Sequence, residues 1–458
     1  MFYLIIRVPP QNNQEENMAQ PIIIQDPTLR NYLFTFRGTF TAPQWKYFVT
    51  VLMGFIHCQA SRTLCGMLRE VAALVTVSGL SRFLISPAWS AEELAKARYI
   101  FFCAEVTPLV AEAHAIQRLD QPKRKGRPSP TVVTGYLILD DSTHVKRYAK
   151  KMSGLGWHYS STNQRSMPGH SLFEGVYVVE GHQYPLSPQM YRQKSVCERE
   201  GVPFQSKVDL AEQVILEFDP LPNTCTHVLI DSWYVNKRIW KAIKSRKWYL
   251  TGGLKKNHKL RVMNAEGEKV WLQIDAYAAV LQKEAFQPVV WPNQEGGQTV
   301  YAQLVRTKVK KLGACQVLIV KTSPDEPGEK ARFYITTCLS GTLEQVVQAM
   351  ALRWTVETLF ADFKELMGSD QYQLHSAEAI IRFWALGLCL YQYLDSLRHR
   401  LKRIKLRDVT LGETLIWLRD RNEGHLLKWI CRLATSGATD QQIQARLASA
   451  LPVLSANC

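Results

Sequence analysis

The sequence of 458 residues lacks the short motifs that mark several common catalytic classes. It has no GxxxxGK[ST] loop for nucleotide phosphates, no HExxH pair of zinc ligands and no GxSxG nucleophile turn. Its 10 cysteines form no CxxC pair and no Cys/His cluster with zinc spacing. We therefore expect neither ATP dependence nor a structural zinc site, and we interpret the cysteines as reduced packing residues of a cytosolic protein.

Long hydrophobic runs are also missing. No stretch approaches the ~18 apolar residues that a membrane span needs, so we expect no membrane partner. The opening residues MFYLIIRVPP have no basic region before their apolar stretch and no small-residue cleavage site, which argues against a signal peptide. Polar residues follow up to Met18, where we expect the folded chain to begin. Whether residues 1–17 are translated stays open.

Positive charge is what the chain has in excess. It carries 56 Lys+Arg against 40 Asp+Glu, a net charge of +16. Such a surplus suits a polyanionic partner, because cations that neutralise phosphates release condensed counterions. A merely basic soluble protein is the alternative. The length predicts two to four domains, and 46% hydrophobic residues are typical of a globular protein.

The N-terminal residues 18–118 are expected to be helical and to bind DNA. Apolar residues recur at helical spacing after Ala42, Ser61–Val75 predicts a second helix, and Ser90 is a suitable N-cap for a third helix that reaches Leu109. A basic linker, residues 119–131, follows. Its Pro and Gly residues break any helix, and it contains the cations Lys123, Arg124, Lys125 and Arg127. Such an arm can lie in a DNA minor groove or simply be solvated.

Residues 132–257 change to the pattern of a mixed α/β sheet. Apolar or β-branched runs predict strands at Val132–Leu139, Ser171–Val179, Gln183–Leu186, His227–Ile230 and Trp248–Leu250. Helical spacing predicts helices at Lys207–Phe218 and Asn236–Arg246. The order of three strands, helix, strand, helix and strand predicts a sheet with helices packed on it.

The rest of the chain divides into three parts. Residues 258–341 are rich in strands and polar turns, and we interpret them as a β insertion. Residues 342–400 return to helix, at Leu343–Leu366 and Ser376–Arg400. Residues 401–458 form a basic, helical C-terminal region.

Carboxylates stand at the ends of two predicted strands. Asp140 and Asp141 follow the first strand, and Asp231 follows the fourth. Ligands bind at the carboxyl ends of strands in an α/β sheet, and these two strands are neighbours in one common arrangement. One Asp in such a place is often only a turn former or helix cap. Two in this register favour a functional site.

A third carboxylate lies on a predicted helix. Arg353 and Glu357 are four residues apart, and Lys364 follows two turns later, so the three side chains share one face. Alone, this pattern also fits a surface ladder of ion pairs.

With these residues the chain resembles the DDE insertion-sequence transposases of bacteria, in the group whose RNase H-like catalytic domain is interrupted by a β insertion. That family carries a Tyr-x2-Arg-x3-Glu-x6-Lys signature, which this sequence matches at Arg353, Glu357 and Lys364. The Tyr position is Met350, so the role of that hydroxyl is missing or filled elsewhere. The resemblance covers about residues 132–400.

The family's acids also have counterparts. Its first Asp matches Asp140, with Asp141 as the alternative, and its second matches Asp231. The resemblance implies two Mg²⁺ ions, replaceable by Mn²⁺, held by Asp140, Asp231 and Glu357. Asp140 would bridge both ions. Arg353 and Lys364 would hold phosphates beside the scissile bond.

The function that the resemblance implies is cut-and-paste transposition. The protein would cleave double-stranded DNA at terminal inverted repeats and join the ends to target DNA, as a homodimer, in the bacterial cytoplasm with the nucleoid. The β insertion would clamp the transposon end, where Trp271 or Trp291 is either a base-stacking or a packing residue. The alternatives are an inactive or domesticated DNA-binding derivative and another RNase H-like nuclease, such as a junction resolvase.

Overall fold

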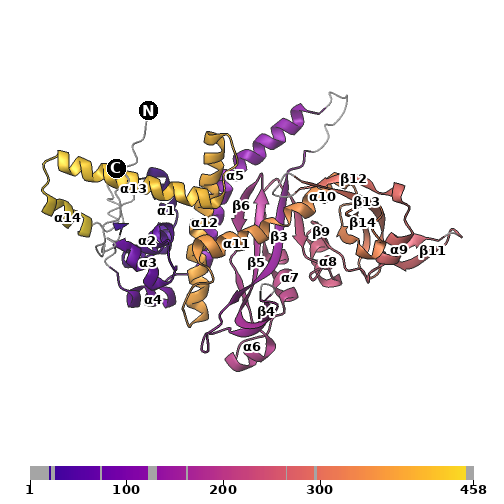
Figure 1. The fold of residues 1–458 in the computed structure, drawn as a ribbon, viewed down its shortest axis with the longest axis horizontal. Helices are drawn as coiled ribbons and strands as arrows, with labels where there is room; N and C mark the ends of the chain where they lie inside the picture. The colour runs from indigo at the N-terminus through magenta and orange to yellow at the C-terminus, as the bar shows by residue number, and fades with distance from the viewer. Residues whose placement is uncertain are drawn as a thin grey trace.

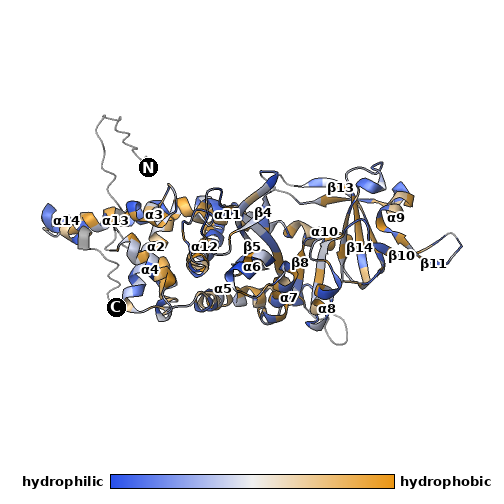
Figure 2. Ribbon diagram, turned by 90° about the horizontal axis from the view of Figure 1, so that it is seen from below, coloured by the Kyte–Doolittle hydropathy of each residue, from blue (hydrophilic) through white to orange (hydrophobic). Residues whose placement is uncertain are grey.

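The computed structural model describes residues 20–21, 26–72, 75–121, 131–160, 163–264, 266–292 and 297–449. Figure 1 shows a long sheet in the middle of the molecule, helices from both ends of the chain on one side of it and a strand-rich segment on the other. Figure 2, turned by 90°, shows the same arrangement, with α14 and β11 near opposite ends. The basic linker residues Lys123, Arg124, Lys125 and Arg127 lie outside the described residues.

The N-terminal part is helical, as predicted. Its helices are α1 (Pro27–Phe34), α2 (Ala42–His57), α3 (Leu64–Glu70), α4 (Val77–Ile85) and α5 (Ala91–Leu119), with the 3₁₀ turn η1 (Arg37–Thr39). Ser90 caps α5 by accepting a hydrogen bond from the amide of Glu92.

Two predicted boundaries in this part are wrong. The predicted helix Ser61–Val75 is too long, because α3 ends at Glu70. The chain then forms the short strand β2 (Val71–Ala72), which pairs with β1 (Gln20–Pro21). The third helix continues past Leu109 to Leu119.

Helix α5 is the one described helix that is long and apolar enough, by length and composition, to cross a membrane. Of its most apolar stretch, 17% is buried within the fold. Arg98 is 1% exposed, and its guanidinium donates to the carbonyl of Pro185. Glu105 forms an ion pair with Arg400 of another helix at 2.7 Å. These polar contacts join α5 to the sheet and to that helix.

The central sheet contains β3 (Thr134–Val145), β4 (Gly156–Ser160), β5 (Arg165–Val179), β6 (His182–Pro185), β7 (Gln189–Tyr191), β8 (Cys225–Ile230) and β9 (Tyr249–Gly253). The strand order is β4-β5-β3-β8-β9, with β3 antiparallel to β5 and parallel to β8. The helices α6 (Lys194–Glu200), α7 (Lys207–Glu217) and α8 (Lys237–Ser245) connect its strands. The predicted RNase H-like mixed sheet flanked by helices is confirmed.

The first strand is longer than its apolar run predicts. It continues beyond Leu139 to Val145, so Asp140 and Asp141 lie inside the strand and do not end it. The reason is that the antiparallel partner β5 keeps pairing up to Val145, whereas the parallel partner β8 stops opposite Leu139. The short strand β4 was not predicted.

Side chains of β3 and β5 alternate between two buried faces. Ile138, Leu172 and Val176 pack in one apolar cluster with α11 (Thr355–Met367) and α12 (Ala377–Lys405). This side is called the α11 face. Leu137, Phe173 and Tyr177 pack in a second cluster with α7 and α8. This side is called the α7 face. Residues of even number on these two strands therefore point to the α11 face.

The remaining helices are α10 (Leu343–Leu352), α13 (Leu411–Thr435) and α14 (Asp440–Ser449). One continuous helix was predicted for Leu343–Leu366, and this is wrong. Arg353 and Trp354 form a turn between α10 and α11, where amide bonds shift to the carbonyl three residues back, as in Val356 to Arg353. The turn lets α10 pack on the strand-rich segment while α11 packs on the central sheet.

The strand-rich segment extends the central sheet. It contains β10 (Lys259–Met263), β11 (Lys269–Gln273), α9 (Ile274–Val280), η2 (Lys283–Ala285), β12 (Gln287–Trp291), β13 (Gln298–Val309), β14 (Gly313–Lys321), η3 (Gly328–Lys330) and β15 (Arg332–Thr336). Strand β15 pairs with β9, so the described strands β3 to β15 form one sheet of 13 strands, separate from the β1–β2 pair.

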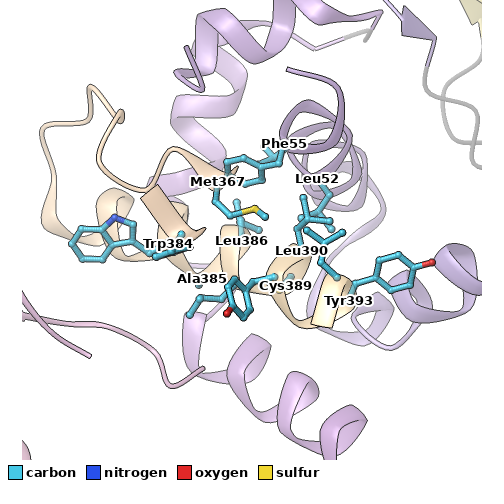
Figure 3. Packing of buried hydrophobic residues seen from close by; sticks show 14 of the residues in the cluster. Leu52, Phe55, Met367, Trp384, Ala385, Leu386, Cys389, Leu390 and Tyr393 are labelled. Atoms are coloured by element: carbon cyan, nitrogen blue, oxygen red, sulfur yellow. The ribbon is translucent and has the colours of Figure 1, made fainter. Parts of the chain in front are cut away.

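Helix α12 joins the N-terminal helices to the core. Figure 3 shows Leu386 and Leu390 of this helix with Leu52 and Phe55 of α2 and Met367 of α11, while the Trp384 ring extends away from them. The last residues of α12, after the buried Leu401, are exposed, and Ile404 among them is 75% exposed.

Helix α12 offers a matched test of this packing. Leu394 is 0% exposed, so Leu394→Ala is expected to lower the free energy of unfolding by about 2–5 kcal/mol through the cavity that it leaves. Ile404→Ala on the same helix should change it by less than about 0.5 kcal/mol. Urea unfolding of both variants measures the difference. Equal effects would contradict the packing described for α12.

Candidate active site

Asp140 and Asp231 lie side by side on neighbouring parallel strands. The last paired residues of β3 and β8 are Leu139 and Ile230. Asp140 is the next residue within β3, and Asp231 directly follows the end of β8. Parallel neighbours are about 4.8 Å apart. By alternation both residues fall on the α11 face, and Asp140 is paired across the ladder with Glu174 of β5. Asp231 is exposed, whereas Asp140 is mostly buried.

The Arg353 guanidinium joins two of the predicted acids. Its Nη1 lies 3.0 Å from Oδ2 of Asp140, and its Nη2 lies 2.6 Å from Oε1 of Glu357. Glu357 is in the first turn of α11, and Arg353 is in the turn before that helix. The break between α10 and α11 thus places an arginine where it can reach both the sheet and the helix. Ion pairs of this kind, mostly shielded from water, are stronger than exposed ones.

The pKa of Asp140 reflects its burial first and the neighbouring charges second. Burial raises the pKa of Asp140 to about 6, and the charges of Asp141 and Asp231 add to the rise. The amide of Asp141 and the Arg353 guanidinium oppose it. Asp140, Asp231 and Glu357 all favour the charged form of Arg353, so the three carboxylates surround one cation. This arrangement is suited to binding further positive charge.

Asp141 faces the other side of the sheet. Its Oδ1 accepts a hydrogen bond from the Tyr234 hydroxyl at 2.7 Å, and its Oδ2 forms an ion pair with Lys207 of α7. Both partners belong to the α7 face. Of the two neighbouring acids, Asp140 is therefore the one that lies with Asp231 and Glu357.

Lys364 is separated from the three acids. It lies on α11, and its Nζ is 3.4 Å from the carbonyl oxygen of Thr143, further along β3. Its charge favours the ionised form of Glu174. The three residues predicted to share one helix face, Arg353, Glu357 and Lys364, therefore lie against different points of β3. Arg353 lies at the acids, and Lys364 lies beyond them.

Glu174 is a buried acid that the sequence analysis did not select. It is 5% exposed, and its Oε2 accepts a hydrogen bond from Ser142 at 2.6 Å. Burial raises the pKa of Glu174 to about 7, against the effects of Ser142 and Lys364. A carboxylate in the middle of the apolar strand Ser171–Val179 was the available clue.

The other aromatic candidates have different surroundings. Trp291 packs on Tyr334 with ring centroids 5.4 Å apart and has the Arg332 guanidinium over its ring, which fits the packing alternative. Trp271 is 41% exposed at the end strand β11. Met350, at the family's Tyr position, is buried.

A second group of possible metal ligands contains none of these acids. The ligand atoms of His182, Asp395 and His399 are within 4.8 Å of one another. However, the two imidazole rings are stacked, 3.7 Å apart and 15° from parallel, so their in-plane lone pairs do not converge on one point. Asp395 already accepts hydrogen bonds from the Gln183 amide and from Arg398. The cluster is therefore a structural network.

A mixed sheet of this order flanked by helices is an RNase H-like fold, and carboxylates from its two central strands and from a covering helix lie on one of its faces. Two family models match the chain. The model described as DDE superfamily endonuclease matches residues 35–269, just over half of the chain, and the transposase DDE domain matches residues 205–393. The chain belongs to the DDE superfamily of transposases and endonucleases.

The two matched ranges together include all three predicted acids. Asp231 lies in both, Asp140 in the first and Glu357 in the second. The family acts on DNA and generally uses divalent metal ions. No curated protein matches the chain.

The raised pKa of Glu174 predicts a pH effect on stability. Between pH 4.5 and about 7 the unfolded chain loses the Glu174 proton while the folded protein keeps it, so the contribution of this group to the free energy of unfolding falls as the pH rises. This contribution amounts to about 3 kcal/mol. Asp140 and the buried histidines also have shifted pKa values, and they act in wild type and variant alike. Glu174→Gln cannot ionise, so the difference in free energy of unfolding between wild type and variant should fall over this range.

Urea unfolding across this pH range measures the effect. Glu365→Gln, on an exposed position of α11, is the control and should follow the wild-type profile. A Glu174→Gln profile parallel to that of the wild type would show that Glu174 ionises at its ordinary pKa in the folded protein.

Proposed function

We propose that this protein is a cut-and-paste DNA transposase whose active site consists of Asp140, Asp231 and Glu357. One observation carries the proposal: Arg353 contacts both Asp140 and Glu357, residues far apart in the chain, on the face where Asp231 also lies. Membership of the DDE superfamily supplies the reaction class. The intact set of three acids argues against an inactive derivative.

The donor set fits hard divalent cations. Three carboxylates on one face offer oxygen ligands, which Mg²⁺ prefers, and the charges of Asp141 and Asp231 add to the rise in the pKa of Asp140 that burial causes. Asp140, Asp231 and Glu357 would together hold two Mg²⁺ ions, with Asp140 contributing to both sites, and Mn²⁺ would substitute. When bound, such ions lower the pKa of water or a 3′-hydroxyl and stabilise the leaving oxygen.

The cations around the site have separate tasks. Before metal binding, Arg353 keeps Asp140 and Glu357 together and offsets their repulsion. When the carboxylates bind cations, the guanidinium becomes available for a phosphate of the DNA, to which its planar fork is suited. Lys364, further along β3, would hold a phosphate next to the scissile one.

Other parts of the chain would bind the rest of the DNA. We assign residues 18–118 to DNA binding, the basic linker 119–131 to sequence-independent affinity and the strand-rich residues 258–341 to a clamp on the transposon end. The net charge of +16 supports a polyanionic partner such as DNA. We expect a homodimer in the complex with DNA and a location with the bacterial nucleoid.

The acids are tested by metal-dependent cleavage of labelled transposon-end DNA. Asp140→Asn, Asp231→Asn and Glu357→Gln should still bind DNA and should lose cleavage and strand joining by more than the roughly 10–100-fold that outer-shell changes cost. Mg²⁺ should support both steps, and the larger Ca²⁺ should permit binding with little cutting.

Asp141→Asn is the matched control, because Asp141 is the neighbouring acid on the opposite face. It should retain cleavage. Cutting that persists in EDTA, or that survives in all three acid variants, would rule out this active site.

Arg353 and Lys364 are tested by separating folding from activity. Arg353→Ala and Lys364→Ala should weaken end-complex formation and cleavage while the melting temperature stays close to that of the wild type. Arg353→Lys should not restore activity, because an ammonium cannot span two acceptors as a guanidinium does. Normal residual activity in variants with lowered melting would show that these residues act only in ion pairs of the fold.

A further inference from the structure

A long stretch of the central sheet contains no acid. Between Asp141 and Glu174 the sequence has no Asp or Glu, while it has five Lys and Arg residues. This stretch includes the loop after β3, the strand β4 and the first half of β5. All charges within this segment are therefore positive, and Glu200 of α6, which accepts hydrogen bonds from Ser153 and Gly154, is paired with Arg192.

Four of these five cations are free for a partner. Lys146 is the exception, since its ammonium donates to the carbonyls of Asp370 and Tyr372. The other four are exposed and form no ion pair within the described residues; they are Arg147, Lys150, Lys151 and Arg165.

Two exposed aromatic rings lie among these cations. Trp157 and Tyr159 of β4 are each 65% exposed, while the residues between and beside them are buried. Their opposite face is covered, because His158 packs on Tyr191 of β7. Large rings left in water on an ordered strand are unusual and mark interaction sites.

The rings point to the same side of the sheet as the active-site acids. Trp157 pairs with Pro168 and Tyr159 with Ser166, both even-numbered positions of β5, as is Glu174 opposite Asp140. Figure 1 shows β4 beyond α11, near α6. Along β5, Pro168 is about 20 Å from Glu174, at 3.3 Å per residue. This is the length of about six nucleotides at 3.4 Å each.

The spacing of the rings suits unpaired bases. Residues two apart on a strand are about 7 Å apart, which leaves room for one base between two rings. The bases of duplex DNA are stacked on each other, so rings on a surface can stack only on a strand that is open. Aromatic rings with cations along the backbone path are the common plan of single-strand binding surfaces.

We propose that the loop cations Arg147, Lys150 and Lys151 and the rings of Trp157 and Tyr159 form a binding surface for single-stranded DNA. The bases stack on the two rings, and the three cations hold phosphates; Arg165, at an odd-numbered position of β5, points to the opposite face. The bound strand is an opened part of the DNA about six nucleotides from the cut, and this identification rests on the proposed function.

The test measures affinity in EDTA, so that no cutting is needed. The full chain is titrated with fluorescein-labelled oligothymidine of about 20 nucleotides, which is longer than one such surface covers. A duplex of equal length is titrated separately. Trp157→Ser with Tyr159→Ser should weaken oligothymidine binding about tenfold or more, with duplex binding almost unchanged. Phe at both positions should restore the affinity.

Charge is tested with a matched set. Changing Arg147, Lys150 and Lys151 to Gln should lower the salt slope of oligothymidine binding by up to about 0.7 per lost phosphate contact. The control changes three exposed lysines of α8, which packs on the α7 face, to Gln; they are Lys237, Lys241 and Lys244. The control should leave the slope close to that of the wild type.

Three outcomes would overturn the proposal: unchanged oligothymidine affinity in the Ser variant, an equal loss on both DNAs, or altered oligomeric state with unaltered DNA binding. The last would indicate a protein partner. Failure of the active site appears separately, as absent nicking in Mg²⁺ with normal binding in EDTA.

Discussion

The contact of Arg353 with both Asp140 and Glu357 is the interaction on which the arrangement of the site depends. Asp140 is mostly buried beside two other carboxylates, and like charges at such distances repel by several kcal/mol at an effective dielectric constant of about 20. The apolar side of α11 packs the helix on the sheet, and the Arg353 cation between Asp140 and Glu357 offsets their repulsion and sets how the two carboxylates face each other. The turn that separates α10 from α11 supplies that cation. A local break in a helix therefore sets the geometry of the carboxylates.

The side chains of β3 point to two faces of the sheet that have different surroundings. Asp140 on the α11 face lies among groups of the candidate active site, while Asp141 on the α7 face is neutralised by Lys207 and Tyr234. Adjacent acids in one strand thus have opposite roles because side chains alternate. The same alternation places the exposed rings of β4 on the α11 face, so that face holds both the proposed catalytic and the proposed single-strand contacts.

Much of the fold could be predicted because its signals are local. The apolar run before Asp140, the cap at Ser90 and the strand before Asp231 each depend on neighbouring residues only, and all three were found. What failed depends on distant partners. The extension of β3 to Val145 requires β5, and the break at Arg353 reflects packing of α10 and α11 on different parts of the sheet. Glu174 was missed because its importance comes from the residue across the ladder, which sequence spacing does not reveal.

The junction of β9 with β15 has a mechanical consequence. Backbone hydrogen bonds run without interruption from the strand that follows Asp231 in the chain into the strand-rich segment, and α10 rests on that segment and ends at Arg353. Two connections therefore join the outer segment to the carboxylates, one through the sheet and one through a helix. A molecule bound at the outer strands would thus lie at a distance from the carboxylates that these two connections set.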